Sequence, residues 1–127
     1  MLFRSLFGTA DKLICDAPCS GLGVLGKKPD LRYKDFATIT ELPALQLEIL
    51  EKSVRYLKVG GIAVYSTCTL NPAENEDVIA KFLENNPDFE LVPFKVGELS
   101  ADSGMLTLLP HKHGTDGFFM AKIIKRK

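Results

Sequence analysis

The chain has 127 residues, enough for one domain with a single hydrophobic core. Hydrophobic residues make up 46% of it and charged residues 25%, proportions that are typical of a soluble globular domain. The 16 basic and 16 acidic residues cancel, which argues against a freestanding nucleic-acid binder, although a catalytic domain could still gain RNA affinity from elsewhere.

The first element predicted along the chain is a short buried strand at Leu13–Cys15, which ends at Asp16. The apolar stretch in residues 1–10 is too short for a signal peptide, and we interpret these residues as a linker or as a scar where a longer protein was cut. Residues 17–42 are rich in glycine and contain Pro18 and Pro29, a composition that predicts loops.

A helix is predicted from Pro43, which suits a first helical position, to the residue before Gly60-Gly61. Its apolar residues recur at helical spacing: Leu45, Ile49, Leu50, Val54 and Leu57. The next segment, Ile62–Cys68, predicts a second buried strand.

Asn71 and Glu74 have the spacing of a capping box, with Pro72 opening a second helix between them. An inner apolar stripe is predicted for this helix at Val78, Ile79, Phe82 and Leu83. Residues 89–94 and 117–124 predict two more strands. The whole order predicts an α/β fold of about four strands, with a parallel pair, an antiparallel edge hairpin and flanking helices.

Three glycines after the first strand, Gly21, Gly23 and Gly26, form a literal G-x-G-x-x-G. In a dinucleotide-binding fold the glycines follow the strand at once and the third opens a helix. Here residues 17–20 intervene, and Lys27-Lys28-Pro29 is no helix start. A tight loop with positive φ is the better interpretation.

Two cysteines lie where chemistry is expected. Cys19 follows the first strand and Cys68 ends the second, and ligands of open α/β sheets bind outside the carboxyl ends of the strands. Parallel neighbouring strands would therefore place Asp16, Cys19 and Cys68 around one crevice. A thiol with a lowered pKa can serve there as a nucleophile. Cys15 alternates away from Asp16 and is expected to be a small buried hydrophobe.

The stretches DAPCSGLG, YSTCTLNPAENE and PHKHGTDGFFMAKI resemble the Sun (Fmu-type) family of RNA cytosine-5 methyltransferases, over about Asp11 to Ile124. The resemblance implies the C-terminal part of a Rossmann-like class I methyltransferase sheet, with residues 11–127 as a partial catalytic domain. The family's glycine-rich cofactor loop is not found before Asp11. We therefore expect the isolated chain to be inactive, to bind no S-adenosylmethionine at micromolar concentration and to self-associate.

The resemblance also implies roles for single residues. Cys68 would be the nucleophile that adds to carbon 6 of cytosine, and Cys19 would assist release of the covalent adduct. Asp16 would hold the polar edge of the base and border the S-adenosylmethionine cofactor, while Pro18 fixes the loop that presents Cys19. RNA, ribosomal RNA foremost, is the implied partner.

Other interpretations remain open. Cys19 and Cys68 could form the reversible pair of a thiol redox enzyme, or the chain could be a non-catalytic binding module. His111 and His113 lack a third ligand at metal spacing, so no metal is expected. The basic cluster of Lys27, Lys28, Arg32 and Lys34, with Tyr33, could contact RNA or be a solvated loop.

The remaining features concern the compartment. The odd number of cysteines, with no C-x-x-C, is typical of a reducing cytosol, and no apolar run approaches the ~20 residues of a membrane span. We expect a cytoplasmic protein that does not associate with membranes.

Overall fold

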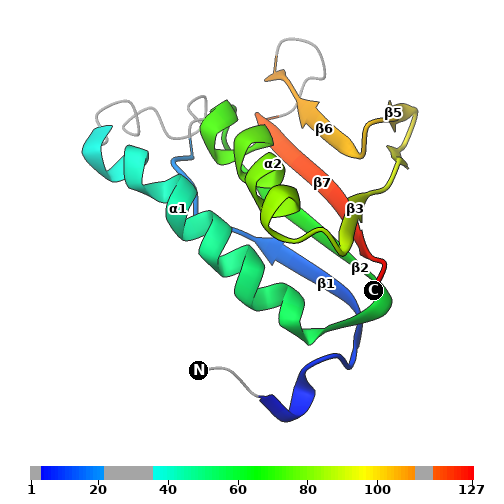
Figure 1. Ribbon diagram of the computed structural model, residues 1–127. Helices are drawn as coiled ribbons and strands as arrows, with labels where there is room; N and C mark the ends of the chain where they lie inside the picture. The colour runs from blue at the N-terminus through cyan, green and yellow to red at the C-terminus, as the bar shows by residue number, and fades with distance from the viewer. Residues whose placement is uncertain (1–3, 22–35, 111–115) are drawn as a thin grey trace.

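The computed structural model describes residues 4–21, 36–110 and 116–127, the first five residues of this middle range by their backbone alone (Figure 1). The helices are α1 (Phe36–Ser53) and α2 (Glu76–Asn85), and single 3-10 turns occur at Arg4–Leu6, Val54–Tyr56 and Pro72–Glu74. The strands are β1 (Ala10–Asp16), β2 (Leu57–Thr67), β3 (Phe89–Leu91), β4 (Phe94–Val96), β5 (Leu99–Ala101), β6 (Met105–Leu108) and β7 (Phe118–Lys125).

The main sheet has five strands in the order β1-β2-β7-β3, with β6 also paired to β7. β1 and β2 are parallel, which confirms the predicted parallel pair. β7 runs antiparallel to β2, β3 and β6, so the predicted antiparallel pairing of the last two strands is also confirmed. β7 is not an edge strand, because β2 lies on one side of it and β3 and β6 on the other.

The first helix and the second strand differ from the prediction. α1 begins at Phe36, so Pro43 lies inside the helix, and it ends at Ser53. β2 begins at Leu57 and runs through Gly60-Gly61, which were expected to separate helix from strand. The prediction was misled because Leu57 is fully buried as a strand residue yet falls at helical spacing after Val54.

The strands that the sequence did not predict, β4, β5 and β6, are short and largely half-buried, so they carry little alternation of apolar and polar residues. The predicted strand 89–94 is split into β3 and the start of β4. A turn before β6 depends on Gly104, whose φ is +86° and whose Cα lies so close to Leu91 that an added Cβ would be 2.8 Å from the Leu91 Cβ.

The hydrophobic core lies between the sheet and the two helices, which cover the same face of the sheet (Figure 1). Val78, Ile79 and Phe82 of α2 are buried as predicted, and Leu83 packs against them half-buried. Cys15 is 5% exposed in this core, which confirms its expected structural role. Burial raises the pKa of the Cys15 thiol, so this cysteine stays protonated.

Candidate functional site

The carboxyl ends of β1 and β2 lie side by side, because the parallel register pairs Asp16 with Ser66. The register continues one residue further, where the Ala17 N–H donates to the Ser66 carbonyl oxygen at 3.1 Å. The Asp16 side chain is exposed, and its Oδ1 accepts a hydrogen bond from Ser66 Oγ at 3.4 Å. Each strand then passes into a loop that carries one of the two cysteines.

The two loop cysteines are in direct contact. Cys19 Sγ lies 3.1 Å from Cys68 Sγ, and the backbone N–H of Cys68 donates to Cys19 Sγ at 3.4 Å. Both side chains are half-buried free thiols. The expectation that parallel neighbouring strands bring these residues together is confirmed, whereas their chemical roles stay predictions.

The electrostatics of this pair favour the protonated form of Cys68. Burial, the hydrogen bond and charge of Cys19, and the negative charge of Asp16 together raise the pKa of the Cys68 thiol from 9.0 to about 11. Cys68 is therefore a neutral thiol at physiological pH in this structure. To act as a nucleophile, it must give up its proton when an electrophile arrives.

Glu74, expected as the capping-box partner of Asn71, instead lies fully buried beside the cysteine loops. Its Oε1 accepts from the Ser20 N–H at 2.8 Å and from Gln46 Nε2 at 3.0 Å. Its Oε2 accepts from Ser20 Oγ at 2.7 Å and from Asn71 Nδ2 at 2.9 Å. The capping-box prediction was wrong for Glu74, because tertiary donors take the carboxylate; Asn71 itself does cap, accepting from the Ala73 N–H.

Gln46 and Asn75 complete the polar layer under the two loops. Gln46 Nε2 donates to the Pro18 carbonyl oxygen at 2.8 Å, so Pro18 lies in the loop as predicted and is also tied to α1. Asn75 accepts from Thr67 Oγ1 at 2.5 Å and donates to the Thr69 carbonyl oxygen at 2.9 Å, holding the residues on both sides of Cys68. Gln46 was not singled out in the sequence, because one polar residue between Leu45 and Leu47 gives no local sign that it is buried.

Several residues considered in the sequence fall outside the described ranges: Gly23, Gly26, the basic cluster with Tyr33, and both histidines. Gly21 is described, and its φ of +74° fits the expected tight loop. Within residues 4–21, 36–110 and 116–127, no three His, Cys, Asp or Glu side chains come together as a metal site. No helix in the same ranges is long and apolar enough to cross a membrane.

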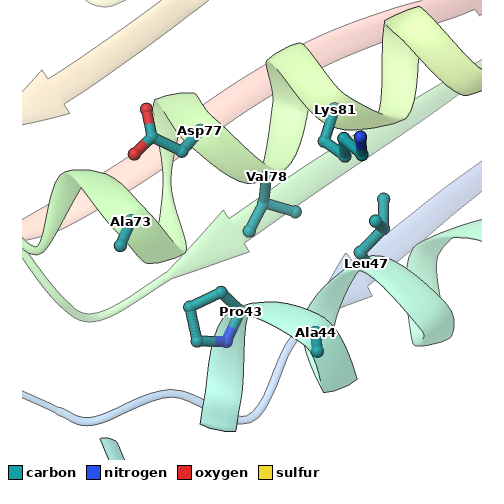
Figure 2. Close-up of a pocket in the computed structure, with 7 residues that line it drawn as sticks. All are labelled: Pro43, Ala44, Leu47, Ala73, Asp77, Val78 and Lys81. Carbon is teal, nitrogen blue, oxygen red and sulfur yellow. The ribbon is translucent and has the colours of Figure 1, made fainter. Parts of the chain in front are cut away.

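A separate hollow of about 220 Å3 lies between α1 and α2 (Figure 2). Val78 projects from α2 toward Pro43 of α1, and the lining is mainly apolar. The full lining is Pro43, Ala44, Leu47, Ala73, Asp77, Val78 and Lys81. None of the predicted site residues belongs to it, so this hollow is distinct from the two thiols.

Solved structures establish the class of this domain. The chain is similar to a methyltransferase homolog protein from Pyrococcus horikoshii, at 42% identity and a TM-score of 0.72, covering 91% of this chain and 39% of that one. It is also similar to NSun6 from Pyrococcus horikoshii with SFG, at 34% identity and a TM-score of 0.80, covering 100% of this chain and 34% of that one. The fold is therefore that of a methyltransferase domain.

The family can be stated more closely. The family described as 16S rRNA methyltransferase RsmB/F matches residues 3–124, nearly the whole chain, and the chain belongs to this family. A Synechocystis relative named "Probable ribosomal RNA small subunit methyltransferase B" is 49% identical over 121 residues, which are 91% of this chain and 27% of the relative. A Bacillus subtilis relative with the same name is 43% identical over 124 residues, which are 91% of this chain and 28% of the relative. The chain thus spans about a quarter of the length of these relatives.

Proposed function

We propose that this protein takes part in the methylation of carbon 5 of cytosine in RNA, ribosomal RNA foremost, with S-adenosylmethionine as methyl donor and a covalent cysteine–cytosine adduct. The observation that carries the proposal is the contact between Cys19 and Cys68 beside Asp16, with 3.1 Å between the two sulfur atoms. Membership of a ribosomal RNA methyltransferase family and the names of the relatives support the substrate.

The chemistry explains why a thiol is needed. Carbon 5 of cytosine is a poor nucleophile until Cys68, having given its thiol proton to solvent, bonds through sulfur to carbon 6, which moves the second electron pair of the carbon 5–carbon 6 double bond onto carbon 5. Carbon 5 could then bond to the methyl group as the bond between that group and the donor's sulfur breaks. A base accepts the carbon 5 proton, the electron pair left on carbon 5 re-forms the double bond, and the bond between sulfur and carbon 6 breaks to release Cys68 as a thiolate. Cys19, in contact with Cys68, assists this second stage. The target base must leave its stack to reach the two thiols.

Asp16 suits both ligands that the reaction requires. Its carboxylate is exposed at the end of β1, and Oδ1 has one long hydrogen bond, from Ser66 Oγ. An exposed carboxylate can accept hydrogen bonds from the amino edge of cytosine and so hold the base in place. The same negative charge fits a cationic sulfonium donor, and the relative NSun6 was solved with SFG, an analogue of that donor. When bound, the donor supplies the methyl group.

The raised pKa of Cys68 is consistent with a nucleophile that reacts only with its proper partner. Burial and Cys19 keep the Cys68 thiol neutral until the target cytosine is bound, which limits the reaction of Cys68 with other electrophiles. The contact between the thiols also fits the alternative of a redox enzyme, in which the pair forms a disulfide. That alternative predicts turnover with a disulfide substrate and no dependence on RNA.

The test uses a chimera in which this chain replaces the 124 residues that it matches in the Bacillus subtilis relative. The chimera, incubated with labelled ribosomal RNA and S-adenosylmethionine, is run on denaturing gels. We expect Cys68→Ala to abolish methylation and the adduct, and Cys19→Ala to retain protein covalently bound to RNA. Cys15→Ala is the matched control, because it removes a thiol of the core and should leave the adduct unchanged.

Two outcomes would contradict the proposal. An adduct in Cys68→Ala but not in Cys19→Ala would exchange the two roles. Methylation that survives in both variants would remove the thiols from the reaction. The chain alone, assayed in parallel, is expected to form no adduct.

A further inference from the structure

Glu74 is the one buried carboxylate that touches both cysteine loops among the described residues, and the proposed chemistry does not use it. It is fully buried, whereas Asp16 at the same end of the sheet is exposed. A buried charged group is stable only when it is paired or hydrogen-bonded, so the hydrogen-bond partners of Glu74 indicate its role in the structure.

All the partners of Glu74 are hydrogen-bond donors. Two donors reach Oε1 and two reach Oε2 at distances between 2.7 and 3.0 Å, and Thr69 Oγ1 is a third, longer donor to Oε2 at 3.4 Å. An ionised carboxylate offers about four acceptor positions and no proton, so this set saturates it. A glutamine of the same shape would place an NH2 group against donors, which makes the carboxylate itself, and not only its size, the required feature.

Apart from Gln46 of α1, these donors come from the two cysteine loops. The Ser20 N–H and Oγ belong to the residue after Cys19, and Asn71 belongs to the loop that follows Cys68. Thr69 Oγ1 lies 2.9 Å from Ser20 Oγ, in a hydrogen bond that either hydroxyl could donate, and 3.4 Å from Glu74 Oε2, to which it can also donate. Glu74 thereby contacts Ser20, the residue after Cys19, and Thr69, the residue after Cys68.

The backbone of Glu74 is itself tied to the core. Tyr65, buried in β2, donates its hydroxyl to the Glu74 carbonyl oxygen at 2.7 Å, and its ring lies against Phe119 in the core. Asn75, next in sequence, holds Thr67 and Thr69 on either side of Cys68. The Glu74–Asn75 dipeptide therefore contacts both thiol loops from one fixed place in the fold.

We propose that Glu74 is a positioning residue: its buried carboxylate joins the loop of Cys19 to the loop of Cys68 and so fixes the approach of the two thiols. The inference deepens the proposed function and takes its catalytic meaning from it. Its test, however, needs neither RNA nor a methyl donor, so the positioning role of Glu74 and the proposed function can be disproved separately.

The experiment measures the alkylation rates of Cys19 and Cys68 by iodoacetamide, from neutral pH to about pH 11, with peptide mass spectrometry on the folded chain. In Glu74→Gln the Cys19 loop loses its anchor, Cys68 becomes more exposed and Cys19 moves away from it. Both changes lower the pH at which Cys68 reacts. We expect its rate at neutral pH to rise about tenfold or more, the change in thiolate fraction for one pKa unit.

Three further variants separate positioning from general stability. Ser20→Ala keeps the carboxylate but removes the hydroxyl that donates to it, so it should shift the pH profile of Cys68 alkylation in the same direction by less. If Glu74→Gln does not fold, Ser20→Ala tests the positioning role in its place. Asp77→Asn changes an exposed charge on α2, and Ile79→Val weakens the core without touching either loop. Both should react like the wild type.

Wild-type profiles in folded Glu74→Gln and Ser20→Ala would overturn the inference. It would also be overturned if Ile79→Val produced the same shift as Glu74→Gln, because the effect would then reflect loosening of the whole fold.

Discussion

Ile14→Lys tests the expectation that the isolated chain self-associates. In the described residues β1 is the edge strand of the main sheet, and it contains no proline. Cys15 belongs to the core between the sheet and the helices, so Ile14, the residue before it in the strand, points to the opposite face, where its side chain is 78% exposed. An exposed apolar edge strand is a template for pairing with another chain.

The size of the effect follows from this exposure. Full burial of an isoleucine side chain is worth about 1.5–3 kcal/mol, and 78% of that is about 1–2 kcal/mol for Ile14. A symmetric pair of β1 strands contains the residue twice, so complete burial of both side chains sets an upper bound of about 2–4 kcal/mol. Replacement by lysine should therefore weaken the dimer by no more than roughly 30- to 700-fold in Kd, before any cost of desolvating the new charge.

Sedimentation velocity and light scattering over a concentration series would measure this change. Leu45→Lys is the control, since Leu45 is also an exposed apolar residue, 44% accessible, but lies on α1, which covers the face of the sheet opposite Ile14. We expect it to leave the dimer constant unchanged. A wild-type chain that remains monomeric at high concentration, or an Ile14→Lys chain that associates as the wild type does, would refute the reasoning.

Two further predictions concern stability. The folded-state pKa of Cys68 is raised from 9.0 to about 11, so its contribution to stability is complete below pH 9 and is lost as the pH rises toward 11. The urea midpoint of unfolding should therefore fall over this pH range, and it should fall less in Cys68→Ala. Equal pH slopes in the two proteins would contradict the assignment. Gly104→Ala should lower the free energy of unfolding by about 2–4 kcal/mol, because it adds both backbone strain and a close contact with Leu91. Gly97 has a φ of +59° with open space around it, so Gly97→Ala should add only backbone strain and lower the free energy of unfolding by about 1–2 kcal/mol. Equal losses in chemical denaturation would show that the contact relaxes freely.

The sequence by itself determined the fold class and the pair of cysteines. Leu13–Cys15 and Ile62–Cys68 are apolar runs of strand length, each followed at once by polar residues, so a parallel pairing had to bring Cys19 and Cys68 to the same edge. The stripe on α2 was readable for a similar reason, because a single buried face imposes a regular spacing.

Only the tertiary structure decided what holds the thiols in place. Glu74 has the spacing of a helix cap, and local sequence cannot tell whether such a carboxylate takes its nearest backbone N–H or donors from distant loops. Gln46 is 28 residues away from both of its partners, Pro18 and Glu74. These polar contacts depend on side chains that converge after the chain has folded, and hydrogen bonds of that kind leave no periodic pattern in the sequence.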